Sequence, residues 1–82
     1  LKRELQARRI GANRLALDLG VPADRVGKIL AGRRAVTADT ALRLGRYFGS
    51  GPEIWMNLQS AYDLDVAQKE KGAEILRSVR AA

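Results

Sequence analysis

Three charged side chains lie within five residues of one another, at Asp24, Arg25 and Lys28. The Arg25 guanidinium can donate two parallel hydrogen bonds to guanine O6 and N7, and the Lys28 ammonium can reach guanine or a phosphate. The Asp24 carboxylate can accept a hydrogen bond from a cytosine amine. For Asp24 and Lys28 a solvated ion pair is an alternative, because side chains four apart on a helix are neighbours. For Arg25 the residue type favours the base contact.

Two further arginines follow directly, at Arg33 and Arg34, after Gly32. A loop with paired arginines beside a base-reading helix is well placed to hold phosphates, which positions a protein without reading sequence. Gly27 lies between the candidate base contacts. Inside a helix it costs about 1 kcal/mol relative to alanine, so we expect either close backbone packing or a near approach to DNA there.

The stretch that must position these side chains runs from residue 12 to residue 32. Apolar residues at helical spacing predict two short helices, 12–19 and 23–31, joined by a turn at Gly20. A small residue, a glycine four positions later and a β-branched residue six further on (Ala16, Gly20 and Val26) are typical of a DNA-binding helix-turn-helix. We expect Val26, Ile29 and Leu30 to be buried, and the outward face to be Ala23, Asp24, Arg25, Lys28 and Ala31.

The rest of the chain also has helical periodicity. We predict a first helix over residues 1–9 and a fourth over 38–48, with Thr37 as its N-cap and Arg43 and Arg46 solvated. The fourth helix is expected to bury Ala41, Leu42, Leu44 and Phe48. A fifth helix should begin near Pro52 and carry Trp55 as a core anchor.

The tail, residues 63–82, is compatible with a helix interrupted at 69–72. It is too polar to form a core alone, so we expect it to pack on the domain or on a second copy. The apolar stripe of the fifth helix and tail predicts a dimer interface formed by Trp55, Leu58, Tyr62 and Leu64. The whole chain, 1–82, is interpreted as a single all-α domain of five or six helices, with the helix-turn-helix at 12–32.

The charge distribution supports a nucleic-acid partner. The 82 residues carry a net charge of +6, but residues 1–46 hold eleven Lys/Arg against four acids and residues 47–82 hold four against five. The basic half, residues 1–46, suits a surface that faces phosphates, and the nearly neutral half, residues 47–82, suits a surface that faces a protein partner. No run of apolar residues approaches the roughly 20 of a membrane span. The chain lacks cysteine, which fits the cytoplasm, and because it begins at Leu1 we expect a few native residues to precede it.

The residue types argue against an enzyme. The sequence has neither histidine nor cysteine, its hydroxyl residues have no partner base, and Asp63 and Asp65 are its only close acidic pair. Two acids flanking a leucine are more often a helix N-terminus than a catalytic or metal site. We therefore expect no catalytic activity, no metal and no cofactor.

Residues 32–64 carry the most specific pattern in the chain, GRRAVTADTALRL followed by YFGSGPEIWMNLQSAYDL. This block resembles the HigA-type, VapI-like antitoxins of the Cro-type (xenobiotic response element) helix-turn-helix family, and the resemblance extends over nearly the whole chain. It implies a Cro/repressor-like fold and a homodimer that binds the palindromic operator of its own operon. It also implies that the protein neutralises a small RNase-type toxin of the HigB (RelE-like) kind.

The chain departs from that family at the start of the second helix, where Gly11-Ala12 replaces the usual Ser-Gln type of sequence. A phosphate contact expected there is weaker, which leaves Asn13 and Arg14 as candidates. The predicted phosphate contacts are therefore Asn13, Arg14, Arg33, Arg34 and Thr37. Two alternatives stay open: a stand-alone repressor without a toxin, and an interaction module that no longer reads DNA.

Overall fold

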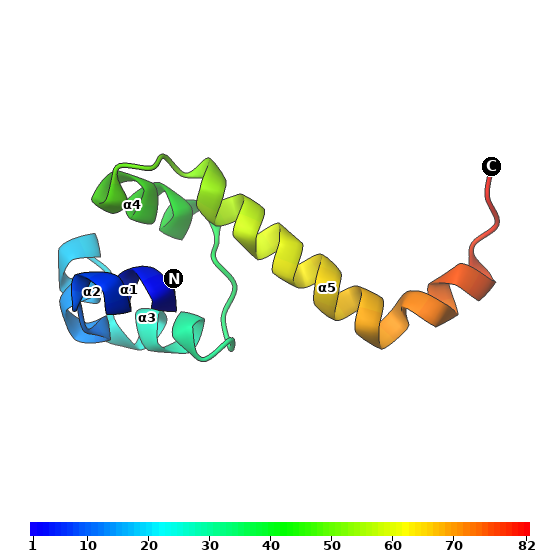
Figure 1. Ribbon diagram of the computed structural model, residues 1–82, viewed down its shortest axis with the longest axis horizontal. Coiled ribbons are helices and arrows are strands. Elements are labelled where there is room, and N and C mark those ends of the chain that lie inside the picture. Colours follow the sequence, from blue (N-terminus) through cyan, green and yellow to red (C-terminus); the bar gives the residue numbers. More distant parts are fainter.

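The computed structural model describes residues 1–82 and is built from five helices with no strand (Figure 1). They are α1 (Lys2–Arg8), α2 (Ala12–Leu19), α3 (Ala23–Leu30), α4 (Ala38–Phe48) and α5 (Glu53–Ser78). The all-α prediction is confirmed, and α2 and α4 have the predicted bounds. The first and third helices are slightly shorter than predicted, because Leu1, Arg9 and Ala31 act as caps.

The core lies where α2 packs against α3 and α4, and α4 in turn packs against the start of α5. The buried apolar residues are Leu5, Leu15, Ala16, Leu19, Val26, Ala41, Leu44 and Trp55. Trp55 is therefore a core anchor, as predicted, and its indole Nε1 donates to Ser50 Oγ at 3.1 Å. Leu17 lies outside the apolar stripe of α2 and is exposed.

The prediction that Leu42 is buried is wrong, since 61% of its surface is exposed. The buried positions of α4 are Thr40, Ala41, Leu44 and Gly45. These four positions cover about 140° of the helix circumference, and Leu42 lies about 60° beyond Gly45, outside that sector. On α3, Val26 is buried as predicted, whereas Ile29 and Leu30 are half-buried.

The turn between α2 and α3 depends on a residue in the left-handed region. Gly20 has φ of 73° and ψ of 34°, a conformation that glycine adopts without the steric cost of a side chain. The Gly20 and Val21 amides donate to the carbonyls of Leu17 and Ala16 at 3.2 and 3.0 Å. These bonds satisfy the end of α2 and let Pro22 begin α3 directly.

A second glycine allows α4 and the loop before α5 to touch. Gly45 is buried, and a Cβ added there would lie 2.6 Å from the Pro52 nitrogen and against the Gly51 carbonyl group. The Gly51 amide donates to the Gly45 carbonyl at 3.3 Å. The chain can therefore reverse from α4 into α5 only because position 45 carries no side chain.

The predicted break at residues 69–72 is wrong, because α5 continues through it to Ser78. One glycine inside a helix costs only about 1 kcal/mol, and the flanking lysine, glutamate and alanine residues favour helix. Asp63 and Asp65 lie inside α5, so the prediction that they mark a helix N-terminus is wrong. An ion pair of 3.0 Å between Asp65 and Lys69 adds local support to the helix. The helix begins beside α4, runs away from the other helices and bends in its orange part (Figure 1), and the molecule has extents of 48 × 22 × 22 Å.

The far half of α5 does not pack on the helical domain. Leu64, Ile75 and Leu76 are 61%, 48% and 83% exposed. Of the two expectations for the tail, packing on its own domain is therefore wrong for this half. None of the five helices combines the length and the hydropathy that a membrane span requires.

We predict that Gly45→Ala lowers the free energy of unfolding by about 1–3 kcal/mol, because the new methyl group overlaps backbone atoms that cannot move independently. Gly27→Ala is the matched control, since a Cβ at Gly27 meets no atom within 4 Å. The control should gain up to about 1 kcal/mol from helix propensity. Thermal unfolding followed by circular dichroism measures both, and a Gly45→Ala protein as stable as the control would contradict the argument.

Candidate nucleic-acid interface

The exposed face of α3 presents Asp24, Gly27 and Lys28 to solvent. The Lys28 ammonium and the Asp24 carboxylate form an ion pair of 3.0 Å on this face. The pair corresponds to the alternative that the sequence left open, and being exposed it is worth only a few tenths of a kcal/mol. Both groups can therefore exchange partners at little cost.

Gly27 has open space around it, so the expectation of close backbone packing is wrong at this position. The other expectation, a near approach of the α3 backbone to DNA, is compatible with this open surface. A side chain at position 27 would stand on the same face as Asp24 and Lys28, three residues before and one after it.

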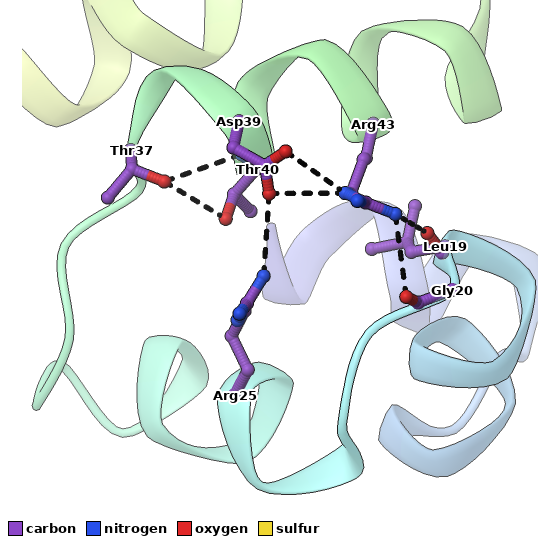
Figure 2. Close-up of polar contacts among 7 residues, drawn as sticks. All are labelled: Leu19, Gly20, Arg25, Thr37, Asp39, Thr40 and Arg43. Atoms are coloured by element: carbon purple, nitrogen blue, oxygen red, sulfur yellow. Dashed lines mark hydrogen bonds and ion pairs between the residues drawn. The ribbon is translucent and has the colours of Figure 1, made fainter.

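Arg25 departs from the predicted outward face. Its side chain is only 25% exposed and points across to the start of α4, where Nη1 lies 3.5 Å from Asp39 Oδ2 (Figure 2). Its Nε atom is enclosed and has no hydrogen-bond partner. In this conformation Arg25 connects two helices and does not stand on the open face of α3.

Asp39 also binds Arg43, one turn further along α4, with 3.1 Å between Oδ2 and Nε. The Nη1 atom of Arg43 donates to the carbonyl oxygens of Leu19 and Gly20 at 2.9 and 3.4 Å (Figure 2). These carbonyls belong to the last residue and the C-cap of α2, where backbone acceptors have no helical partner. The prediction that Arg43 is merely solvated is therefore wrong, because it caps α2.

The loop that carries Arg33 and Arg34 is held by α5. The Val36 amide donates to Gln59 Oε1 at 2.8 Å, and Gln59 Nε2 donates to Asp63 Oδ1 at the same distance. Arg33 and Arg34 are exposed and form no ion pair, so both guanidinium groups remain available to an anion. Sequence reasoning missed Gln59, whose spacing to Asp63 gave no sign that it would reach a loop 23 residues away.

The other predicted phosphate contacts occupy different surroundings. Asn13 is exposed at the start of α2, and Arg14 is also exposed but pairs with Asp18 at 3.1 Å. Thr37 is the N-cap of α4, as predicted, since its Oγ1 accepts from the Thr40 amide at 3.4 Å. Its hydroxyl is therefore already engaged within the chain.

The residues predicted for a dimer interface divide into two groups. Trp55 is 5% exposed and belongs to the core of the protomer. Leu58, Tyr62 and Leu64 are 50%, 56% and 61% exposed. Leu58 and Tyr62 lie on one side of α5, and Leu64 lies roughly 120° to 160° around the helix from them, so apolar surface stays open on more than one side.

The comparisons with known proteins agree with this geometry. No family model matches the sequence. Virulence-associated protein I of Dichelobacter nodosus is 47% identical over 62 residues, which span 76% of this chain and 57% of that protein. The chain thus spans little more than half the length of that curated relative.

Two solved structures extend over almost the whole chain. A HigA-family addiction module antidote protein from Coxiella burnetii is 44% identical, with a TM-score of 0.92 and coverage of 99% of this chain and 88% of that one. The Pseudomonas aeruginosa antitoxin HigA, solved with the higBA promoter, is 39% identical, with a TM-score of 0.88 and coverage of 93% and 83%.

The fold and the open face of α3 together define a protein of the helix-turn-helix class. The sequence identity to the two antitoxins and the share of each chain that the alignments cover identify the family within that class. The chain belongs to the HigA family of antitoxins. Its relatives are named as antitoxins and helix-turn-helix regulators, not as enzymes.

We predict that Arg43→Ala destabilises the protein by about 1–2 kcal/mol, because hydrogen bonds from a charged donor are worth more than neutral ones and the side chain is partly exposed. Arg46→Ala is the control on the same helix, since Arg46 is exposed and forms no ion pair. It should change stability by less than about 0.5 kcal/mol. Equal midpoints of urea unfolding for the two variants would show that the capping bonds contribute nothing.

Proposed function

We propose that this protein is a DNA-binding antitoxin that binds the operator of its own operon as a dimer and neutralises an RNase-type toxin of the HigB (RelE-like) kind. The observation that carries the DNA part is the exposed face of α3, in a chain related along nearly its whole length to an antitoxin solved with its promoter. Repression of an operon places this activity in the cytoplasm, where the chromosome lies.

In this proposal α3 enters the major groove and Asp24 and Lys28 contact base edges. Asp24 accepts from a cytosine amine and Lys28 donates to guanine, and their ion pair opens at little cost. The open space at Gly27 lets the helix backbone come close to the DNA. Arg25 is not among these base contacts, because its side chain faces α4.

Affinity comes from the phosphate contacts. Arg33 and Arg34 extend from a loop that Gln59 fixes against α5, so they can clamp the DNA backbone beside the groove. Asn13, Arg14 and Thr37 are the remaining candidates. Each phosphate that is neutralised should steepen the fall of log K with log salt by about 0.9.

Dimerisation would present two copies of α3 to successive turns of the major groove, about 34–36 Å apart. The exposed apolar residues of α5 support this part of the proposal, because Leu58, Tyr62 and Leu64 are each at least half exposed in the single chain. A second copy packed along α5 would cover part of this apolar surface and would fix the distance between the two reading helices.

The first experiment is a fluorescence-anisotropy titration of the full chain against its own upstream region and a scrambled duplex, at two salt concentrations. The proposal expects tight and selective binding to the upstream region. Equal, salt-sensitive binding to both duplexes would contradict it. Co-expression with the neighbouring gene tests the toxin: a stable complex supports the antitoxin role, and its absence favours a stand-alone repressor.

Two variants separate base reading from phosphate binding in that assay. Arg34→Ala should weaken binding to operator and scrambled DNA alike and reduce the salt slope by about 1. Lys28→Ala should relax preference at one base pair, at a cost of about 1–3 kcal/mol on the operator alone. If Lys28→Ala weakens both duplexes equally, Lys28 does not read bases.

The dimer is tested by Leu64→Glu, which places a charge in the proposed interface and should convert the dimer to a monomer. Ala81→Glu, beyond the end of α5, is a control for the added charge on an exposed residue. Size-exclusion chromatography with light scattering gives the mass of each. A Leu64→Glu protein that remains dimeric would move the interface elsewhere.

A further inference from the structure

Arg25 is enclosed more tightly than a residue that reads bases should be. Three quarters of its side chain is covered, and its guanidinium lies between α3 and the first turn of α4 (Figure 2). Asp24 and Lys28, on the same helix, have side chains that are 73% and 52% exposed. The cations of α3 are thus divided between an open face and an interhelical contact.

Two of the three guanidinium nitrogens of Arg25 already face the protein. A bidentate contact to guanine uses two adjacent N–H groups of the guanidinium plane. The side-on pair needs Nε, which is enclosed, and the end-on pair shares Nη1 with the contact to Asp39. Arg25 would have to leave its position between the helices before it could read a base.

Asp39, the partner of Arg25, also binds a second arginine. The Asp39 carboxylate accepts from Arg25 on α3 and from Arg43 on α4, and Arg43 donates to the carbonyls at the end of α2. Asp39 itself lies in the first turn of α4, where the helix dipole favours a negative charge. One carboxylate therefore connects α4, the reading helix and the turn that precedes it.

We infer that Arg25 and Asp39 are positioning residues: their ion pair fixes the orientation of α3 relative to α4, and Arg25 acts on DNA recognition through that orientation and not by reading a base. This inference rests on the proposed DNA-binding function. It assigns to Asp39, an acidic residue close to the DNA-binding face, a favourable role in binding a polyanion.

If Asp39 positions α3, removing its carboxylate should change operator affinity in the direction opposite to that expected from simple electrostatics. Removing a carboxylate near the DNA raises the net charge by one and should by itself strengthen binding. If Asp39 positions α3, Asp39→Asn should instead weaken operator binding, by about three- to tenfold. Glu70→Gln is the matched control, because it removes one negative charge from an exposed residue of α5 that forms no ion pair.

Arg25→Met and the double variant complete the experiment. The proposal expects Arg25→Met and Asp39→Asn to lower operator affinity without changing the order of base preferences across a half-site. The double variant should be little worse than Asp39→Asn, because Asp39→Asn already removes the contact that Arg25→Met removes. Arg25→Lys keeps a cation near Asp39 and should restore part of the affinity.

Circular dichroism at the assay temperature checks that each variant remains folded. A purely structural defect would lower the melting temperature and leave the affinity of the folded protein unchanged.

Three results would overturn the inference: tighter binding by Asp39→Asn, additive losses in the double variant, or loss of preference at a single base pair in Arg25→Met alone. The last result would make Arg25 a base reader. Failure of the proposed function looks different, because the wild-type protein would then fail to distinguish the operator from scrambled DNA.

Discussion

Three side chains, one from each of three helices, hold the helix-turn-helix together. Leu15 of α2, Val26 of α3 and Leu44 of α4 are the largest fully buried side chains in the chain. Burying each contributes about 1.5–3 kcal/mol, and only 10 of the 82 residues are fully buried. Since net stability is a small difference between large terms, truncating any one of these three side chains should weaken the fold appreciably.

Small residues around this centre let the helices approach, and polar contacts then set their directions. Ala16 and Ala41 are almost fully buried, and Gly45 lets the α4–α5 loop touch the α4 backbone. Arg43 fastens the end of α2, and Gln59 fastens the arginine loop to α5. Contacts of this kind contribute at most about 1–2 kcal/mol each, and they also orient the elements that they join.

Local signals in the sequence were sufficient for the helices but not for their partners. Periodicity and the Thr37 cap define α4, because both act within a few residues. The capping role of Arg43 and the inward turn of Arg25 depend on which helix lies opposite, and contacts over 14 to 24 residues leave no periodic trace. The continuity of α5 through Gly72 was missed because a glycine weakens a helix without ending it.

The cations of the basic half fall into two kinds with different physical roles. Arg14 and Lys28 already have carboxylate partners within the free chain, whereas Arg33 and Arg34 have none. A cation without a partner attracts a polyanion at the longest range that screening allows, about 10 Å at 0.1 M salt. A paired cation contributes less at a distance, because its neighbour cancels its field, but its side chain is already ordered. In the proposed complex the arginine loop therefore governs approach and salt dependence. The paired residues act only at contact, where exchanging a weak surface ion pair for a fitted base or phosphate discriminates one sequence from another.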